Sequence, residues 1–264
     1  MPPRDDLYGV MRMALPKLPE RSVLVITSKI VSIGEGRCIP KEHYPDKDVL
    51  IKKEADKYLP REETPGTWVM HTLKRNIFIP SAGIDESNSG AYYTLWPKDP
   101  QASAQKIWKM LRRAYRIKNL GIVISDSHSV PLRRGMMGFA LSYYGFQPLK
   151  EYRGTNDLFG REMKMTQRNF PDALATAAVM AMGEGNESMP LALIRDIPDI
   201  TFGTRTPKSR FPHSSFEIKT REDLYYPFLS AVRWKKGGGG IEYPYETRKI
   251  PSLRRTMPSR STTA

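Results

Sequence analysis

The sequence predicts an α/β fold with mixed strands and flanking helices. Two runs rich in β-branched apolar residues, 23–33 and 121–124, are typical of buried strands. Residues 99–117 lie between them and have the spacing of an amphipathic helix, which begins with Asp99 and Pro100. This helix delivers the chain to the second run, which we expect to be the central strand.

The other elements follow from periodicity and from glycine or proline breaks. Before the long helix we expect a helix over 5–18 that ends near Pro16, a turn at 34–36, a surface helix over 46–59, and two strands within 68–84 joined by a turn at 74–76. After the central strand we expect strands over 136–146, 164–170 and 191–194, helices over 172–182 and 222–234, and a flexible glycine break at 237–240.

Composition narrows the class of protein. The chain has 264 residues, of which 39% are hydrophobic, and no apolar run approaches the roughly 20 residues that a membrane span requires. A single cysteine, Cys38, excludes an intrachain disulfide and a cysteine-rich metal site. The four histidines lack the spacing of metal ligands. These features indicate a cytoplasmic protein and make a zinc enzyme an unattractive hypothesis.

Two carboxylates follow apolar runs in the same way. The run 121–124 stops at Ser125, Asp126 and Ser127. An earlier apolar segment, which ends in AGIDESN, stops in the same way at Asp85. Ligands of open α/β sheets bind at the carboxyl ends of strands, and carboxylate and hydroxyl oxygens ligate Mg²⁺ or Mn²⁺. We therefore expect Asp85 and Asp126 to converge on one cation. The alternative is an ordinary Ser/Asp turn without a ligand.

Three arginines are candidates for holding phosphate or substrate carboxylates, because guanidinium presents paired donors in a fixed geometry. Arg133 and Arg134 follow the central strand within one short loop, and Arg161 lies in a polar loop. The alternatives are solvated side chains and, for Arg161, a salt bridge with Asp157.

A glycine-containing loop follows the predicted helix 172–182. Gly183 and Gly185 on either side of Glu184 allow the backbone to approach a ligand closely, as phosphate loops require. Glycines after a helix are also ordinary C-caps, so this motif alone does not establish a phosphate site.

Five motifs taken together are more specific than any of them alone. They are, in order, SKIVSIGEGR, AGIDESN, ISDSHSVPLRRG, YRGTNDLFGRE and MGEGNESMP. From about residue 5 to about residue 196 the chain resembles the coenzyme F-420-0:L-glutamate ligase (CofE-like) family of γ-glutamyl ligases. The segments GAYYTLWPKDP and DLYYPFLSAVRWKKG are most similar to a branch assigned to folate metabolism.

This resemblance implies a fold, a reaction and a set of partners. Members of the family have a family-specific α/β fold, form homodimers, and use GTP with Mg²⁺ or Mn²⁺, commonly at a two-metal site. They join the amine of L-glutamate to a carboxylate, here that of coenzyme F-420-0 or folate. The resemblance also allows a monovalent cation, and it does not decide between GTP and ATP or fix the number of glutamates added.

The resemblance also implies the residues of the site. The metal ligands fall on Asp85, Asp126, Ser127 in the place of a threonine, and Glu184. The nucleotide contacts fall on Ser28, Lys29, Asn88, Met182, Gly183, Glu184, Gly185, Asn186, Glu187, Ser188 and Met189.

Two departures from the family pattern concern the nucleotide site. A Leu-Pro-containing nucleotide loop of the family precedes the segment that Asp5, Asp6 and Leu7 match, and the given sequence begins after it. A family lysine corresponds to Ile33. Either the true start lies upstream, or one wall of the nucleotide site is missing.

The basic charge supports a second hypothesis of another class. The formal net charge is +14, and part of the excess lies near the C-terminus. We expect a ligase domain over 1–236 and a basic, disordered tail over 237–264. The alternative function is a catalytically inactive ligase-like domain that binds nucleotide or nucleic acid through its basic surface and tail, although such tails commonly add only salt-sensitive, nonspecific affinity.

Overall fold

A mixed four-stranded sheet forms the centre of the protein. The computed structural model describes residues 1–15, 17–204 and 216–240. The strand order is β11–β1–β7–β8, with bounds β1 Ser22–Thr27, β7 Leu120–His128, β8 Met137–Tyr144 and β11 Leu191–Arg195. Strands β1 and β7 are parallel, whereas β11 and β8 pair antiparallel to their neighbours. The predicted α/β fold with mixed strands is confirmed.

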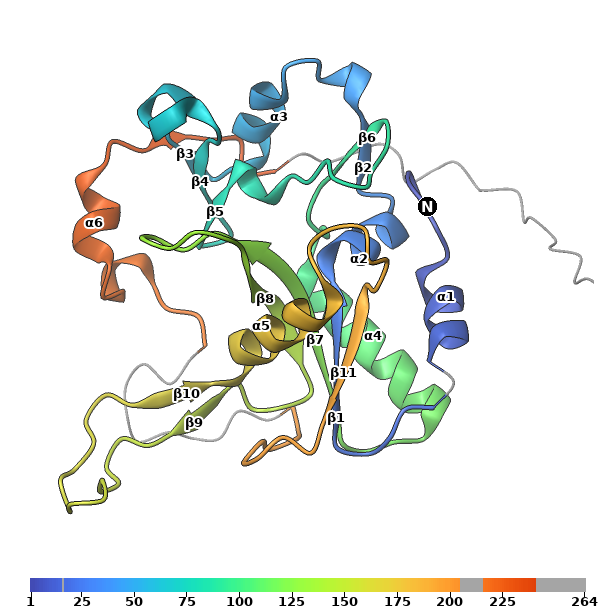
Figure 1. Ribbon diagram of the computed structural model, residues 1–264, viewed down its shortest axis with the longest axis vertical. Coiled ribbons are helices and arrows are strands. Elements are labelled where there is room, and N and C mark those ends of the chain that lie inside the picture. The colour runs from blue at the N-terminus through green and yellow to red at the C-terminus, as the bar shows by residue number, and fades with distance from the viewer. Residues whose placement is uncertain (16, 205–215, 241–264) are drawn as a thin grey trace, which may run out of the picture.

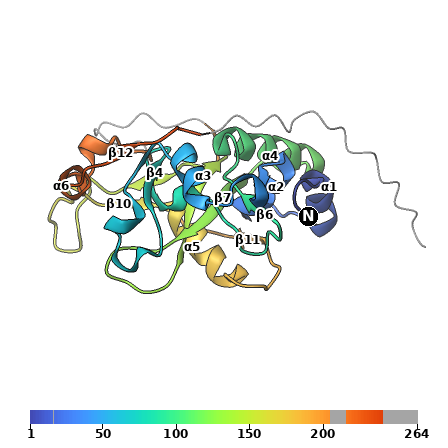
Figure 2. The ribbon, with the colours of Figure 1, turned by 90° about the horizontal axis from the view of Figure 1, so that it is seen from above.

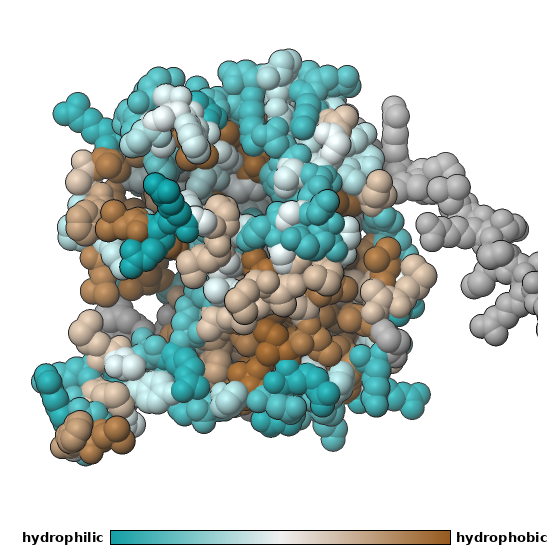
Figure 3. All heavy atoms as spheres, viewed as in Figure 1, coloured by the Kyte–Doolittle hydropathy of each residue, from teal (hydrophilic) through white to brown (hydrophobic). Residues whose placement is uncertain are grey.

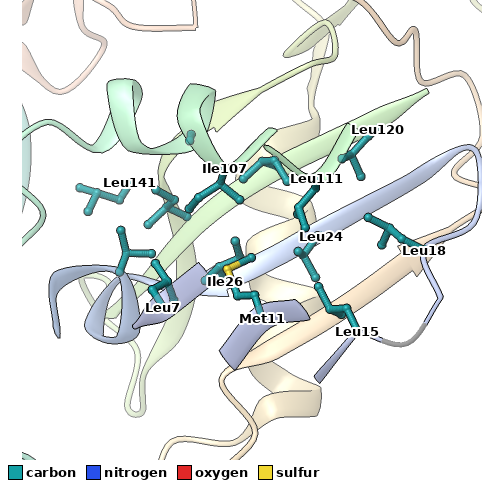
Figure 4. Packing of buried hydrophobic residues seen from close by; sticks show 14 of the residues in the cluster. Leu7, Met11, Leu15, Leu18, Leu24, Ile26, Ile107, Leu111, Leu120 and Leu141 are labelled. Atoms are coloured by element: carbon teal, nitrogen blue, oxygen red, sulfur yellow. The ribbon is translucent and has the colours of Figure 1, made fainter. Parts of the chain in front are cut away.

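Helices cover both faces of this sheet, as Figures 1 and 2 show. One face carries α1 (Leu7–Ala14), α2 (Ser28–Glu35) and α4 (Pro100–Tyr115), and the other carries α5 (Phe170–Met182). Because side chains alternate along a strand, β1 sends Leu24 and Ile26 to the first core and Val23 and Val25 to the second. Figure 4 shows the first core between α1, α4 and the sheet.

Helix α4 begins as the sequence predicts. The Asp99 side chain accepts a hydrogen bond from the Ala102 N–H at 2.9 Å, and Pro100 occupies the first turn, where its missing N–H is not needed. Ala104, Ile107 and Leu111 are fully buried on one face. This face anchors the helix against β7 and β8.

A second layer lies beside the central sheet, at the top of Figure 1. It contains a four-stranded antiparallel sheet, a two-stranded sheet and one helix around a separate core that includes Leu50, Met70 and Leu95. Its elements are β2 Cys38–Pro40, β6 Tyr92–Thr94, α3 Lys47–Glu54, β3 Lys57–Tyr58, β4 His71–Lys74, β5 Ile77–Pro80 and β12 Lys235–Lys236. Short 3-10 turns occupy Lys41–His43, Arg61–Glu63, Pro65–Thr67, Ser81–Gly83 and Thr220–Glu222.

An arm formed by β9 (Leu149–Glu151) and β10 (Gln167–Asn169) projects from the body of the protein (Figure 1). Leu158 and Phe159 in its loop are 98% and 96% exposed. Helix α6 (Tyr226–Ala231) also presents apolar side chains to solvent, and Figure 3 shows both groups on the surface.

The largest correction to the predicted elements concerns residues 28–33. They were expected to continue the first strand, but they form α2, which Thr27 caps by accepting a hydrogen bond from the Lys29 N–H. The buried positions Ser28, Val31 and Ser32 have helical spacing. Tertiary packing of this face therefore outweighs the strand propensity of the β-branched residues. Gly36 ends the helix in the left-handed conformation, with φ of 71°.

Several boundaries also differ. Strand β7 does not stop before Ser125 but continues through Asp126 to His128, after a bulge between Ile124 and Ser125. The helix expected over 46–59 ends at Glu54 and buries an inner face rather than lying on the surface. The helix expected over 222–234 shrinks to α6, and its predicted apolar face is largely exposed.

The glycines 237–240 do not form a flexible break. The N–H groups of Gly237 and Gly239 donate to the carbonyls of Asp56 and Ala55, and those of Gly238 and Gly240 donate to Lys52 and Lys53, all at 2.9 to 3.0 Å. These bonds satisfy carbonyls at the C-terminal end of α3. The predicted disordered tail from residue 241 onward lies outside the described residues.

Candidate functional site

A cavity of about 740 Å³ lies at the carboxyl ends of β1 and β7. The segments that line it include the start of α2, residues 79–88, residues 94–96, the end of β7, and the loop that follows α5. Because β1 and β7 are parallel and in register at Thr27 and Ser125, both strands deliver the residues after them to the same edge of the sheet.

Asp126 forms part of the cavity wall. Its Oδ1 accepts a hydrogen bond from the Ser127 N–H at 2.8 Å, and its Oδ2 accepts one from the Trp96 indole N–H. The pKa of Asp126 is raised to about 6, mainly because the carboxyl group is desolvated by burial and also because the charge of Asp85 is near. The two hydrogen bonds act in the opposite direction and lower this pKa. Among the described residues, no cationic side chain forms an ion pair with this carboxylate.

Asp85 lies in the same cavity but has a cationic partner. Its Oδ2 is 2.7 Å from Lys29 Nζ, and its Oδ1 accepts hydrogen bonds from the N–H and hydroxyl of Ser87 at 2.7 and 2.8 Å. Burial acts to raise the pKa of Asp85, but Lys29 and Ser87 hold it below its ordinary value. Lys29 also donates to the Ser87 carbonyl at 2.8 Å, so the start of α2 is joined to this turn.

The loop after α5 closes another side of the cavity. The helix ends at Met182, and the C-cap residue Gly183 has φ of 81°. Glu184 Oε2 accepts a hydrogen bond from the Ser127 hydroxyl at 3.0 Å, and Asn88 Nδ2 donates to the Gly185 carbonyl at 2.8 Å. These two bonds hold the loop against β7 and against the segment that carries Asp85.

Most of the residues predicted for the site line this one cavity. They are Ser28, Lys29, Asp85, Asn88, Asp126, Ser127 and the whole loop Met182, Gly183, Glu184, Gly185, Asn186, Glu187, Ser188 and Met189. Ile33, at the position of a family lysine, also lines it.

The three candidate arginines lie elsewhere. Arg133 and Arg134 are exposed in the connection between β7 and β8, and Arg161 is exposed in the arm; none of them lines the cavity. Arg161 contacts Asp157 through its backbone N–H, which donates to the Asp157 carboxylate at 2.9 Å. Their role in binding phosphate or carboxylate groups stays a prediction.

The carboxylates agree with a hard divalent cation in chemical type. Asp85, Asp126, Glu184 and the Ser127 hydroxyl offer only oxygen atoms, which Mg²⁺ and Mn²⁺ prefer. Among the described residues no group of three His, Cys, Asp or Glu side chains is arranged to hold a metal ion, and Lys29 pairs with Asp85. A cation would therefore require these side chains to rearrange, with Lys29 yielding its place beside Asp85.

Two contributors to the site were not predicted. Ser87 supplies two hydrogen bonds to Asp85, and its position in AGIDESN was a usable signal. Trp96 donates to Asp126, but a tryptophan in an apolar segment gives no sign of whether its N–H reaches a functional carboxylate.

A cavity at parallel strand ends that combines carboxylates, a lysine and a glycine-containing loop is typical of enzymes that act on phosphorylated ligands. Comparison with known proteins defines the family. Residues 1–196 match the family described as F420-0:Gamma-glutamyl ligase, and the chain belongs to it.

Similar proteins include three described as coenzyme F420:L-glutamate ligase. That of Methanococcus maripaludis (strain C7) is 32% identical over 196 residues, which cover 69% of this chain and 78% of the relative. That of Methanocaldococcus jannaschii is 31% identical over 199 residues, covering 70% and 79%. That of Methanothermobacter thermautotrophicus is 32% identical over 212 residues, covering 74% and 84%.

These findings confirm the resemblance drawn from the five motifs and the assignment to a family of ligase enzymes. A search of the described part of the chain for a helix with the length and apolarity of a membrane span finds none.

Proposed function

We propose that the protein is a ligase that joins the amine of L-glutamate to a carboxylate of coenzyme F-420-0 or folate, using GTP and Mg²⁺ or Mn²⁺. One observation carries the proposal: the carboxylates and the loop that match the family motifs meet in a single cavity. The relatives named above are described as acting on coenzyme F420 and L-glutamate, which supports the glutamate half of the reaction.

The reaction requires activation of a carboxylate, because its oxygen is a poor leaving group. Transfer of the γ-phosphoryl group of GTP to the acceptor carboxylate gives an acyl phosphate and releases GDP. The glutamate amine then attacks the carbonyl carbon, loses a proton and displaces phosphate, which leaves the amide. A divalent cation held by Asp85, Asp126, Ser127 and Glu184 would supply neutralisation of phosphate charge.

The chain's own residues have separate roles in this proposal. Lys29 places an ammonium group in the cavity, where it would attract the phosphates of the nucleotide. Ser28 and the loop 182–189 would surround the nucleotide, and Asn88 would hold that loop in place through Gly185. Arg133, Arg134 and Arg161 stay candidates for binding substrate carboxylates.

The identity of the acceptor, coenzyme F-420-0 or folate, is a separate part of the proposal. The family description and the names of the relatives support coenzyme F-420-0, whereas the branch to which GAYYTLWPKDP is most similar supports folate. One assay distinguishes the two acceptors. Each acceptor is supplied in turn, and the product is identified by its mass as the acceptor with added glutamate.

The test uses the purified chain with GTP or ATP, Mg²⁺ or Mn²⁺, and L-glutamate. We expect phosphate release that depends on glutamate together with one acceptor. Absence of glutamate-dependent nucleotide turnover with both acceptors would contradict the proposal. An Asp126→Asn variant serves as the control for contaminating phosphatases.

We further propose that the enzyme is a cytoplasmic homodimer. The exposed apolar residues Leu158 and Phe159 on the arm and Phe228 on α6 support association, because large exposed apolar side chains mark interaction surfaces. Light scattering on the purified chain would give a dimer mass, and a monomer at assay concentration would contradict this part.

The alternative of an inactive domain that binds nucleic acid through its tail gains no specific support, since the tail lies outside the described residues. Deletion after Gly240 separates the two hypotheses: it should remove such binding and leave ligase activity intact.

A further inference from the structure

Trp96 is an almost fully buried residue of the cavity wall and contacts the carboxylate of Asp126. The side chain is 1% exposed, and its indole N–H donates a hydrogen bond to Asp126 Oδ2. Trp96 follows β6 in the second layer, whereas Asp126 belongs to the central sheet. The bond therefore joins the two layers at the site.

The indole is held in one orientation by its surroundings. A Cβ atom at Gly83 would lie 2.2 Å from indole Cε2, and Gly83 has φ of 67°, so only glycine leaves room for the ring there. The ring of Phe139 packs against the indole with 6.3 Å between centroids, and Phe139 lies opposite Asp126 in the pairing of β7 with β8. The Trp96 carbonyl accepts a hydrogen bond from Arg37 Nε at 3.1 Å.

A buried cation faces the same ring. Lys74 Nζ lies 5.5 Å from the centroid of the Trp96 ring, and Lys74 is itself 5% exposed and paired with the fully buried Glu54. A cation over the face of an indole draws electron density from the ring. This polarisation makes the indole N–H a stronger hydrogen-bond donor to Asp126.

We propose that Trp96 is a positioning residue that orients Asp126 for the divalent cation, with Lys74 behind it. The inference rests on the proposed function, because it requires Asp126 to be a metal ligand. Partners that hydrogen-bond to metal ligands fix their orientation, and loss of such a partner commonly weakens metal binding 10- to 100-fold. Trp96 does not itself touch the nucleotide or the metal in this proposal.

The test measures Mn²⁺ binding alone, by calorimetry, so that catalysis is not needed. Trp96→Phe removes the indole N–H and keeps an aromatic ring. Trp108→Phe is the matched control, because its indole N–H donates to the Leu120 carbonyl at 2.7 Å and it does not line the cavity. We expect the Kd for Mn²⁺ to rise about tenfold or more in Trp96→Phe and to stay unchanged in Trp108→Phe.

The outcomes separate this inference from the proposed function. If the wild type binds Mn²⁺ and folded Trp96→Phe binds it equally well, the positioning role is wrong and the proposed function stands. If the wild type binds no Mn²⁺, the metal part of the proposed function fails and the positioning role fails with it. An equal loss of affinity in Trp108→Phe would show a general structural effect and would also overturn the inference.

A second measurement does not depend on the folding of Trp96→Phe. In protein labelled with ¹⁵N-tryptophan, addition of Mg²⁺ should shift the indole N–H resonance of Trp96, because the acceptor carboxylate changes partner. The resonance of Trp108 should not move. Asp126→Asn should shift the Trp96 resonance without Mg²⁺ and remove its response. An unchanged Trp96 resonance on metal addition to a protein that binds Mn²⁺ would contradict the proposal.

Discussion

Buried charges occur in two regions of the molecule, and the two regions treat them differently. In the second layer, the Glu54 carboxylate is fully buried and meets the ammonium of Lys74, with Arg37 Nη2 at 3.5 Å. In the cavity, Asp126 receives hydrogen bonds but forms no ion pair with any residue that the structure describes, and burial together with the charge of Asp85 raises its pKa to about 6. The first arrangement compensates charge within the protein, whereas the second leaves charge for a ligand.

This difference predicts that charge removal affects the stability of the protein differently in the two regions. Asp126 is half-buried, and a desolvated carboxylate without an ion-pair partner costs free energy, so its replacement by a neutral group should not destabilise the protein. Removal of Lys74 takes from Glu54 its closest cationic partner and leaves the buried carboxylate poorly compensated, which should destabilise the protein strongly. We therefore expect substitutions in the cavity to lower activity without lowering stability, and substitutions of the Glu54–Lys74 pair to lower stability.

The largest effect is expected for Asp126→Asn. Metal-dependent nucleotide turnover should fall by about a thousandfold, because charge stabilisation by a bound cation contributes several kcal/mol and each 1.4 kcal/mol is about a factor of ten. The midpoint of thermal unfolding should not fall. Asp196→Asn, which changes an exposed aspartate, is the control. Activity of Asp126→Asn within threefold of the wild type would contradict the claim that the charge of Asp126 serves a bound ligand.

The next effect is expected for Lys74→Met in the second layer. The free energy of unfolding should fall by about 3–5 kcal/mol, because Glu54 loses its closest partner. Denaturant unfolding measures this change. A double variant that adds Glu54→Gln should recover part of the loss, since the poorly compensated buried charge is then gone. If Lys74→Met were as stable as the wild type, Lys74 would not be the residue that compensates the buried charge of Glu54.

A smaller effect is expected where the C-terminal glycines contact α3. A Cβ atom at Gly237 would lie 2.0 Å from the Ala55 carbonyl oxygen, so Gly237→Ala must displace backbone, at about 1–3 kcal/mol of stability. At Gly185 the nearest atom to an added Cβ is 3.4 Å away, and Gly185→Ala should leave the unfolding midpoint unchanged. Equal midpoints for the two variants would mean that the glycine segment does not stabilise the second layer.

The smallest effect is expected in the arm, where charges are paired near the surface. Hydrogen bonds from Arg153 lower the pKa of Glu151 from its ordinary value of 4.5 to about 2. A carboxylate with a lowered pKa contributes stability above its unfolded pKa and loses it as the pH falls through the folded value. Arg153→Ala should therefore cost less than about 1 kcal/mol at pH 7, and this cost should shrink as the pH falls below 4.5 toward 2. Unfolding curves between pH 2 and pH 7 test this, and a difference that grows toward low pH would contradict it.

Local signals in the sequence account for much of the fold. The cap at Asp99, Pro100 and the apolar spacing of α4 are local features, and the helix forms as predicted. Residues 28–35 show the limit, because their β-branched side chains favour a strand, while burial of Ser28, Val31 and Ser32 against the core selects a helix. The long-range packing that decided this outcome is not visible in a short window of sequence.

The same distinction applies to the site. Asp85, Asp126 and Glu184 could be predicted because each belongs to a motif of the family, and the structure places them in one cavity. The role of Trp96 could not, because it depends on the second layer packing against β7 so that one N–H meets one carboxylate. The distance of Arg161 from the cavity likewise follows from the path of the arm, which local pattern does not determine.

The central claim is that this cavity binds a nucleotide together with a divalent metal. Calorimetric titration of GTP, and of ATP for comparison, into the wild type and into Asp126→Ala with and without Mn²⁺ tests it most directly. We predict binding by the wild type that requires Mn²⁺ and is lost in the variant. Equal nucleotide affinity in the two proteins, or binding by the wild type that does not depend on Mn²⁺, would contradict the account.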